Sequence, residues 1–157
     1  MTKLPLRPNV CMIILNSENH LLLGERYGEE GIWQFPQGGV EDGGSLEENV
    51  YREIEEELGI GRSSVEIIMK LSATHEYDFA TPPPYAIGKW RGQSQTFWLV
   101  RFSGHDSEIN VMGESPEFSS IRWCTPDEVR RLAEPKRKPG YEAPLRELEA
   151  YLKKIDP

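Results

Sequence analysis

The sequence predicts an α/β fold in which a β-sheet is flanked by helices. Three observations support this class: short apolar segments are bounded by turn residues, one amphipathic helix is expected in the middle of the chain, and another is expected at its end. The chain has 157 residues and shows no internal repeat or break in composition. We therefore expect one domain, residues 1–157, with a substantial core.

The expected strands are short apolar segments, and one of them is rich in aromatic and β-branched residues. Residues 16–19 separate the first two segments and predict a β-hairpin. Three prolines at 82–84 break regular structure and indicate a loop. The five strands are expected at residues 10–15, 20–24, 65–71, 96–102 and 121–123.

The central helix is predicted from its ends and from its apolar spacing. Ser45 followed by Glu48 forms a capping box, and Gly59 stands where a left-handed C-terminal cap is expected, so the helix covers about 46–58. Apolar residues at 145–155 follow helical spacing and predict the second, C-terminal helix. The central helix has one apolar stripe that should face the core, formed by Leu46, Val50, Ile54 and Leu58.

Three glutamates of the central helix, Glu53, Glu56 and Glu57, fall within an arc of about 100° on the helical wheel. Like charges at this spacing cost about 0.2–0.5 kcal/mol per pair, and helix propensity does not require them. One interpretation is a solvated acidic face. The other is a divalent-metal site, because Glu57 lies at the edge of the buried face and the preceding 37–39 turn brings backbone groups close to a ligand. Carboxylate oxygens suit Mg²⁺ or Mn²⁺.

The segment that begins at Gly38 resembles the Nudix box, G-x5-E-x7-R-E-U-x-E-E-x-G-U, where U is aliphatic. Gly44 departs from the pattern, because it stands where the box has its first glutamate. In the family that glutamate is usually a supporting acid and the later glutamates usually bind the metal. The resemblance therefore implies weaker support for the loop or for Arg52, but no loss of catalysis. The positions that match are Gly38, Arg52, Glu53, Ile54, Glu56, Glu57, Gly59 and Ile60.

Further segments are similar to bacterial RNA pyrophosphohydrolases, which remove pyrophosphate from a 5′-triphosphorylated RNA end and leave a 5′-monophosphate. These segments are RPNV at 7–10, WQFPQGG at 33–39, GQSQ at 92–95, and PEF at 116–118 followed by RW at 122–123. Together they cover nearly the whole chain, and the resemblance implies an α/β/α sandwich with a mixed sheet.

Three other functions stay open. Related enzymes that hydrolyse dinucleoside polyphosphates, such as diadenosine tetraphosphate, share much of this pattern. Nucleoside triphosphate pyrophosphatase activity is a lesser alternative. A non-catalytic ligand sensor with the Nudix fold is disfavoured by the intact Glu53, Glu56 and Glu57.

A polyphosphate beside these glutamates requires divalent ions between the two sets of oxygens, so Mg²⁺ or Mn²⁺ is the expected cofactor. The resemblance also implies that the glutamates are catalytic, but it does not decide which one is the general base. The expected metal ligands are Gln37, through a nearby backbone carbonyl, and Glu53, Glu56, Glu57 and Glu117. The cations expected to bind the substrate are Arg7, Arg26 and Lys136. An exposed loop acid is the alternative for Glu117, and a solvated surface patch is the alternative for the cations.

The net charge of −8 argues against extensive contact with an RNA backbone. Recognition should be confined to the triphosphate and the first few nucleotides. The aromatic residues around the proline loop offer a stacking surface for a base, or else they anchor the loop. They are Tyr77, Phe79, Tyr85 and Trp90.

The remaining composition bears on location and assembly. The two cysteines show no disulfide framework or metal-ligand spacing. The chain has no secretory signal pattern and no apolar run that approaches about 18 residues, so we expect a cytoplasmic protein without a membrane partner. A homodimer is compatible with the sequence, which does not determine the oligomeric state.

Overall fold

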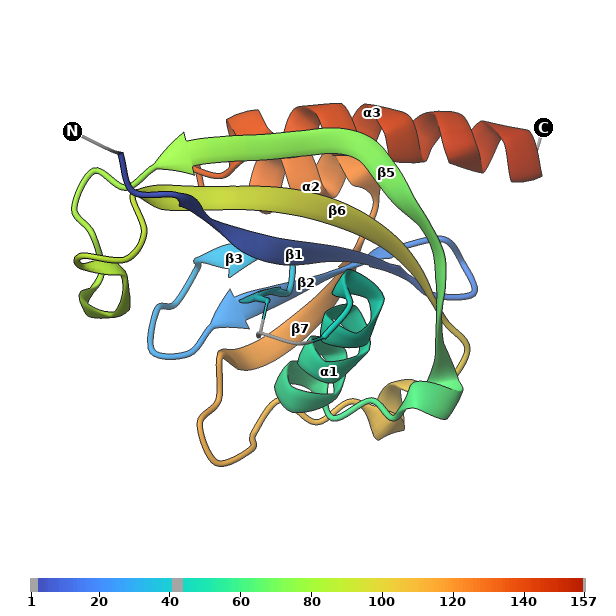
Figure 1. Cartoon of the computed structure of the whole chain (residues 1–157). Helices are drawn as coiled ribbons and strands as arrows, with labels where there is room; N and C mark the ends of the chain where they lie inside the picture. The colour runs from blue at the N-terminus through green and yellow to red at the C-terminus, as the bar shows by residue number, and fades with distance from the viewer. Residues whose placement is uncertain (1–2, 41–43, 157) are drawn as a thin grey trace.

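The computed structural model describes residues 3–40 and 44–156, which form a seven-stranded mixed sheet with α-helices on both faces. Figure 1 shows α1 on one face and α2 and α3 on the other, so the predicted α/β/α sandwich is confirmed. The α-helices of the described residues are α1 (Leu46–Leu58), α2 (Pro126–Leu132) and α3 (Lys138–Ile155). Short 3-10 helices cover η1 (Arg62–Ser64), η2 (Pro84–Ala86) and η3 (Asp106–Glu108).

The sheet is built around its first strand. The strands are β1 (Leu6–Leu15), β2 (Leu21–Arg26), β3 (Trp33–Gln34), β4 (Gln37–Gly39), β5 (Val65–Asp78), β6 (Gly92–Phe102) and β7 (Phe118–Cys124). β1 pairs in parallel with β6 and antiparallel with β2 and β4, and this combination makes the sheet mixed. β5 pairs antiparallel with β6, and β2 pairs antiparallel with β3 and β7.

The expected strands are all present, but most are longer than the sequence predicted. The β1–β2 hairpin is confirmed by the pairing of Leu15 with Leu21. β5 continues to Asp78 because its polar second half pairs with the equally polar start of β6, and such residues lack the apolar pattern that predicts a strand. The two-residue β3 and three-residue β4 were not anticipated, since segments this short show no periodicity.

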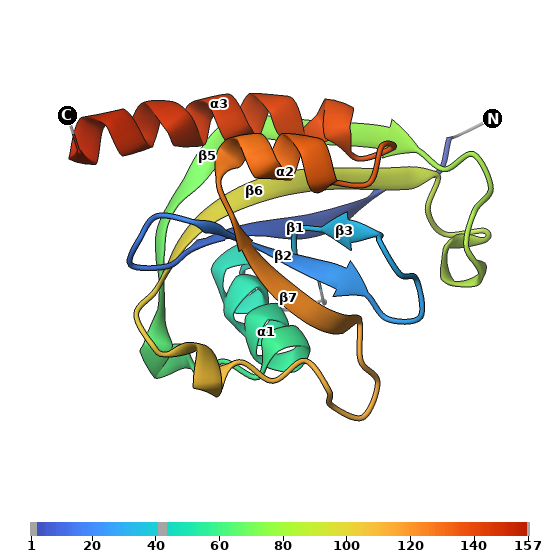
Figure 2. The ribbon, with the colours of Figure 1, turned by 180° about the vertical axis from the view of Figure 1, so that it is seen from behind.

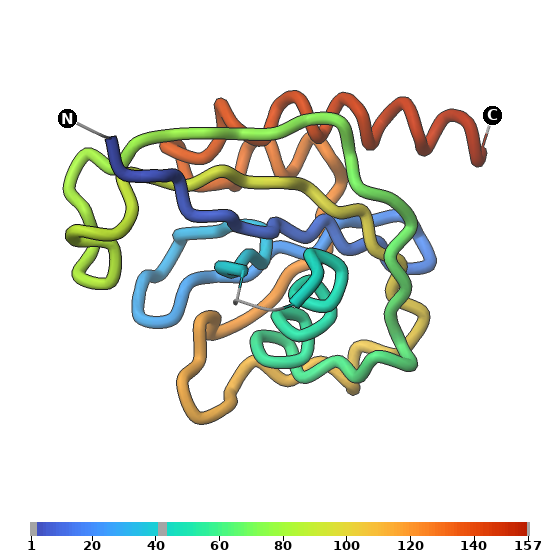
Figure 3. Tube along the Cα trace, viewed as in Figure 1, coloured from blue at the N-terminus to red at the C-terminus, as the bar shows by residue number. Residues whose placement is uncertain are grey.

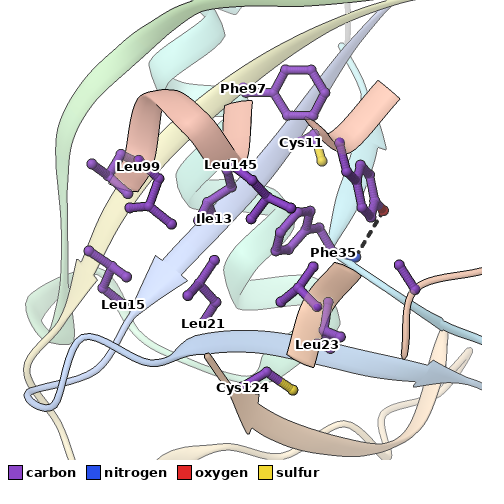
Figure 4. Packing of buried hydrophobic residues seen from close by; sticks show 14 of the residues in the cluster. Cys11, Ile13, Leu15, Leu21, Leu23, Phe35, Phe97, Leu99, Cys124 and Leu145 are labelled. Atoms are coloured by element: carbon purple, nitrogen blue, oxygen red, sulfur yellow. Dashed lines mark hydrogen bonds between the residues drawn. The ribbon is translucent and has the colours of Figure 1, made fainter. Parts of the chain in front are cut away.

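Alternate residues of β1 are buried in two separate cores, because successive side chains of a strand point to opposite faces of the sheet. Val10, Met12 and Ile14 face α1. Cys11 and Ile13 face the opposite way, toward α2 and α3, and Figure 4 shows them packed with Phe35, Phe97, Leu99 and Leu145.

α1 has the ends that the sequence predicts. The Ser45 hydroxyl accepts a hydrogen bond of 3.1 Å from the Glu48 backbone N–H, and Gly59 adopts a φ of 69°. The apolar stripe faces the core as expected: Val50, Ile54 and Leu58 are fully buried, and Leu46 packs at the edge of the same cluster. This packing fixes the rotation of α1 and therefore the direction in which its glutamates point.

The two remaining α-helices lie side by side over the other face of the sheet, as Figure 2 shows from behind. Arg130 of α2 joins them through hydrogen bonds to Glu142 (3.0 Å) and Glu149 (2.6 Å) of α3. These bonds hold the pKa of both carboxyls below its usual value. α3 begins several residues before its apolar pattern, and its start brings residues 136–137 toward the end of β5.

The proline loop is confirmed as a loop with the short helix η2 inside it. Figure 3 shows residues 79–91 projecting from one end of the sheet, between β5 and β6. None of the described helices is long and apolar enough to cross a bilayer.

Candidate active site

Two glutamates of α1, Glu53 and Glu57, are buried beneath the short strand β4. Glu53 is 8% exposed and Glu57 is 7% exposed, although both are ionisable residues. β4 can approach α1 closely because Gly38 has no side chain: a Cβ there would lie 2.1 Å from the carboxyl carbon of Glu53. Glu56 is instead exposed, and its carboxylate accepts a hydrogen bond of 3.1 Å from Arg52. The structure therefore brings two of the three predicted glutamates together in the interior.

The buried pair carries two carboxyl groups, of which Glu53 pairs with Arg52 at 2.9 Å. Burial raises the pKa of Glu57 well above its usual value, and the negative charges of Glu53 and Glu117 raise it further. The Gln37 backbone N–H opposes this rise by hydrogen bonding. Burial also raises the pKa of Glu53, although Arg52 opposes that shift. Among the described residues, Glu57 Oε2 is a buried oxygen with no hydrogen-bond partner.

A divalent cation fits this donor set. A bound cation would offset the repulsion between the carboxylates and engage the unpaired Glu57 oxygen. No three acidic, histidine or cysteine side chains of the described residues converge as a ready-made metal cage. Mg²⁺ commonly binds through one or two carboxylates and completes its shell with water and substrate phosphates, which agrees with a buried pair of glutamates.

Glu117 lies just before β7, on an exposed segment. Its backbone carbonyl accepts a hydrogen bond of 2.8 Å from the Tyr27 N–H, which holds this segment beside the end of β2. Because its carboxylate raises the pKa of Glu57, it lies within electrostatic range of the buried pair. Glu117 is thus an exposed loop acid, as the alternative interpretation held, and it is also near the predicted site.

A cleft of about 690 Å³ opens next to β4. Arg26, Gln37 and Lys136 line it, although they come from distant parts of the sequence. Gln37 links the two regions, because it lines the cleft and its backbone N–H bonds to Glu57. Two of the three predicted substrate-binding cations therefore share one cleft with the strand that covers the buried carboxylates.

The third predicted cation, Arg7, lies beside the aromatic wall of the cleft. Its guanidinium carbon is 4.6 Å from the centroid of the Tyr85 ring. Tyr77 and Phe79 meet edge to face with ring centroids 6.0 Å apart, and Phe79 meets Tyr85 in the same way at 6.4 Å. Trp90 is half-buried and is not among the residues that line the cleft.

Lys136 and Arg137 stand at the α3 end of the cleft and share one carboxylate. Glu134 pairs with Lys136 Nζ at 3.3 Å and with Arg137 Nε at 3.1 Å. The sequence analysis singled out Lys136 but not its neighbour Arg137. Lys138 points elsewhere and donates to the backbone carbonyl of Arg131.

Further polar residues that the sequence did not single out shape the cleft. The Gln95 amide donates to Gln37 Oε1 at 2.6 Å and to Asn9 Oδ1 at 3.1 Å. Gln95 therefore fixes the side chain of Gln37, the residue that lies between the buried glutamates and the cleft. Tyr141 accepts a hydrogen bond of 3.1 Å from the Phe35 N–H, marked by the dashed line at Phe35 in Figure 4. The GQSQ segment contained the signal for Gln95, but the cross-strand contact depends on the register of the folded sheet.

Comparison with known proteins agrees with this architecture. Residues 5–147 match the model of the NUDIX domain. RNA pyrophosphohydrolases from Rickettsia rickettsii (strain Sheila Smith) and Rickettsia canadensis (strain McKiel) are 35% and 34% identical over 152 residues, which cover 95% of this chain and 93% of each relative.

Two solved structures show the same fold at low sequence identity. An Ap4A hydrolase binary complex from C. elegans has a TM-score of 0.65 at 19% identity, over 92% of this chain and 98% of that one. The E. coli dihydroneopterin triphosphate pyrophosphohydrolase has a TM-score of 0.64 at 15% identity, over 90% of this chain and 97% of that one. The domain match and the identity along nearly the whole chain show that this protein belongs to the Nudix family.

Proposed function

We propose that the protein is a metal-dependent hydrolase that removes pyrophosphate from the 5′-triphosphate end of RNA and leaves a 5′-monophosphate. The observation that carries this proposal is the position of Gln37, which connects the buried Glu53–Glu57 pair to a cleft lined by Arg26 and Lys136. The relatives named RNA pyrophosphohydrolase, 35% identical along nearly the whole chain, support the choice of substrate.

Mg²⁺ or Mn²⁺ is the proposed cofactor. Glu53 and Glu57 would hold it, together with a backbone carbonyl near Gln37. When bound, the ion supplies positive charge that offsets the charges of the carboxylates and phosphates, and it makes the attacking water more acidic. Glu56 and Glu117 are proposed as further ligands, although Glu56 is paired with Arg52 in this structure.

The chain's own residues then bind the substrate and handle the proton. Arg26 and Lys136 hold the phosphates through charged hydrogen bonds. Water attacks phosphorus, the bond between the α- and β-phosphates breaks, and pyrophosphate leaves. Glu117 is proposed to take the proton of that water, because it is exposed and its charge raises the pKa of Glu57. Arg7 and the aromatic wall that it contacts face the first nucleotides.

The charge of the protein limits how much RNA it contacts. With a net charge of −8, the surface does not favour a long nucleic-acid backbone. We therefore expect affinity to depend weakly on RNA length. A steep gain in affinity from short to long triphosphorylated RNAs would contradict this part of the proposal. We place the reaction in the cytoplasm, as a step that initiates RNA decay.

A comparison of substrates tests the proposal. The kcat/KM values for triphosphorylated RNA, diadenosine tetraphosphate and free nucleoside triphosphates are measured with Mg²⁺ and with Mn²⁺. RNA is expected to be the best substrate. If RNA is the poorest of the three, the proposal is wrong. Diadenosine tetraphosphate is the second candidate, because the aromatic wall formed by Tyr77, Phe79 and Tyr85 suits an adenine as well as the first base of an RNA.

A further inference from the structure

Arg52 connects three parts of the site. Its Nη2 donates to the Gly39 carbonyl at the end of β4, at 3.2 Å. Its Nη1 donates to Glu53 Oε1 at 2.9 Å and to Glu56 Oε2 at 3.1 Å. The direction of the Glu53 carboxylate therefore depends on where the Arg52 guanidinium is held, and so does the distance between α1 and β4.

The shortest of the described Arg52 contacts comes from a buried amide. Asn49 is 2% exposed, and its Oδ1 accepts a hydrogen bond of 2.6 Å from Arg52 Nη2. The Asn49 amide nitrogen donates to the Ser45 carbonyl at 2.7 Å. Residues three and four positions apart lie on one face of a helix, so Asn49 is fixed to the first turn of α1 on one side and to Arg52 on the other. Both polar atoms of the buried amide are thereby satisfied.

The neutral side chain of Asn49 suits a position beside Arg52, which already has two carboxylate partners. Arg52 already faces the carboxylates of Glu53 and Glu56, and its single positive charge is shared between them. An amide oxygen orients the guanidinium without adding a third negative charge to the group. Gly44, which stands where the Nudix box has a supporting glutamate, has no side chain with which to hold Arg52.

We propose that Asn49 is a positioning residue of the metal site, which holds Arg52 and through it Glu53, and which supplies the support that Gly44 cannot. This inference rests on the metal site of the proposed function. It concerns binding of the metal alone, so it does not depend on which phosphoanhydride is the substrate.

Mn²⁺ binding to the full-length protein, measured by the loss of the free-ion EPR signal, tests the inference without substrate. Asn49→Ala removes both hydrogen bonds and is expected to weaken Mn²⁺ binding by about 10- to 100-fold, the usual effect of losing a residue that orients a metal ligand. Asn49→Asp keeps an acceptor for Arg52 but adds a third negative charge beside it and loses the donor to the Ser45 carbonyl, so its Mn²⁺ affinity should lie between those of Asn49→Ala and the wild type. Val129→Ala, at a fully buried position of α2 in the core on the other face of the sheet, is the control: it should lower stability and leave Mn²⁺ binding unchanged.

Rescue by a second substitution separates positioning from general stability. Gly44→Glu alone should change Mn²⁺ binding little, whereas Gly44→Glu combined with Asn49→Ala should recover most of the lost affinity. Wild-type affinity in a folded Asn49→Ala protein would overturn the inference, and so would a lack of rescue.

If Asn49→Ala fails to fold, Asn49→Gln replaces it. The longer side chain moves the amide acceptor by one methylene, so Asn49→Gln should bind Mn²⁺ at least about 10-fold more weakly than the wild type, and wild-type affinity would overturn the inference. Failure of the proposed function is seen separately. A wild-type protein that binds Mn²⁺ but leaves triphosphorylated RNA intact refutes the substrate and not the role of Asn49, whereas a wild type that binds no Mn²⁺ refutes the metal site and this inference together.

Discussion

Replacing Glu57 with glutamine should lower activity and raise stability at the same time. The side chain is 7% exposed, and burial together with the charge of Glu53 raises its pKa well above its usual value. Glu57→Gln keeps the shape of the side chain and removes the charge. Without metal, the free energy of unfolding at neutral pH should rise by about 1 kcal/mol, because an uncompensated buried charge is removed.

The effect on catalysis has the opposite sign. Loss of a proposed metal ligand removes several kcal/mol of transition-state stabilisation, and about 4 kcal/mol corresponds to a fall of about 10³-fold in kcat/KM. The metal response should change as well. At a Mn²⁺ concentration about 100 times its Kd, the wild type should gain about 2.7 kcal/mol of stability, and the variant should gain far less.

Urea unfolding with and without Mn²⁺ measures both stability changes, and a steady-state assay on triphosphorylated RNA measures the turnover. Glu55→Gln is the control, because Glu55 is an exposed glutamate of the same helix. It should leave all three quantities close to those of the wild type. An active Glu57→Gln protein, or one that Mn²⁺ stabilises as strongly as the wild type, would refute the metal assignment.

Three further changes test other parts of the structure. Gly38→Ala places a Cβ 2.1 Å from the carboxyl carbon of Glu53, so kcat/KM should fall at least about 10-fold, whereas Gly61→Ala, which meets open space, should not change it. Tyr141→Phe leaves a buried backbone N–H without its acceptor and should lower the free energy of unfolding by about 1–3 kcal/mol, measured in urea. Arg130→Ala should lower the melting temperature at pH 7. Folding lowers the pKa values of its carboxylate partners on α3, so these ion pairs stabilise the protein above the unfolded-state pKa near 4.5. That stabilisation is lost as the pH falls through the folded-state pKa values. The difference in melting temperature between Arg130→Ala and the wild type should therefore shrink in acid.

The parts of the fold that the sequence predicted are those set by local chemistry. α1 has its capping residues and its apolar stripe within one continuous segment, so its bounds at Leu46–Leu58 matched the structure. α2 is seven residues long and shows too little periodicity to be recognised by that criterion. A sharper signal was present, because Thr125 and Glu128 form a capping box and Pro126 occupies the first helical position.

In the site, too, the sequence predicted the residues that local patterns mark and missed the contacts that only the fold creates. The helical wheel indicated Glu53, Glu56 and Glu57, and the Nudix resemblance indicated Glu117 and the cations. The contact between Gln95 and Gln37 joins strands that are far apart in the chain. The sequence of neither strand predicts the register that brings these two residues together. The sequence did not predict a role for Asn49, because a single asparagine inside a helix indicates no function until its two hydrogen-bond partners are known.

Release of pyrophosphate from triphosphorylated RNA, followed for wild-type and Glu57→Gln protein with Mg²⁺ and with EDTA, tests the central claim most directly. We expect the wild type with Mg²⁺ to yield pyrophosphate and an RNA with a 5′-monophosphate, and the other three combinations to yield almost none. Equal pyrophosphate release in EDTA, or by the Glu57→Gln protein, would contradict the assignment of the buried carboxylates to a metal-dependent hydrolase.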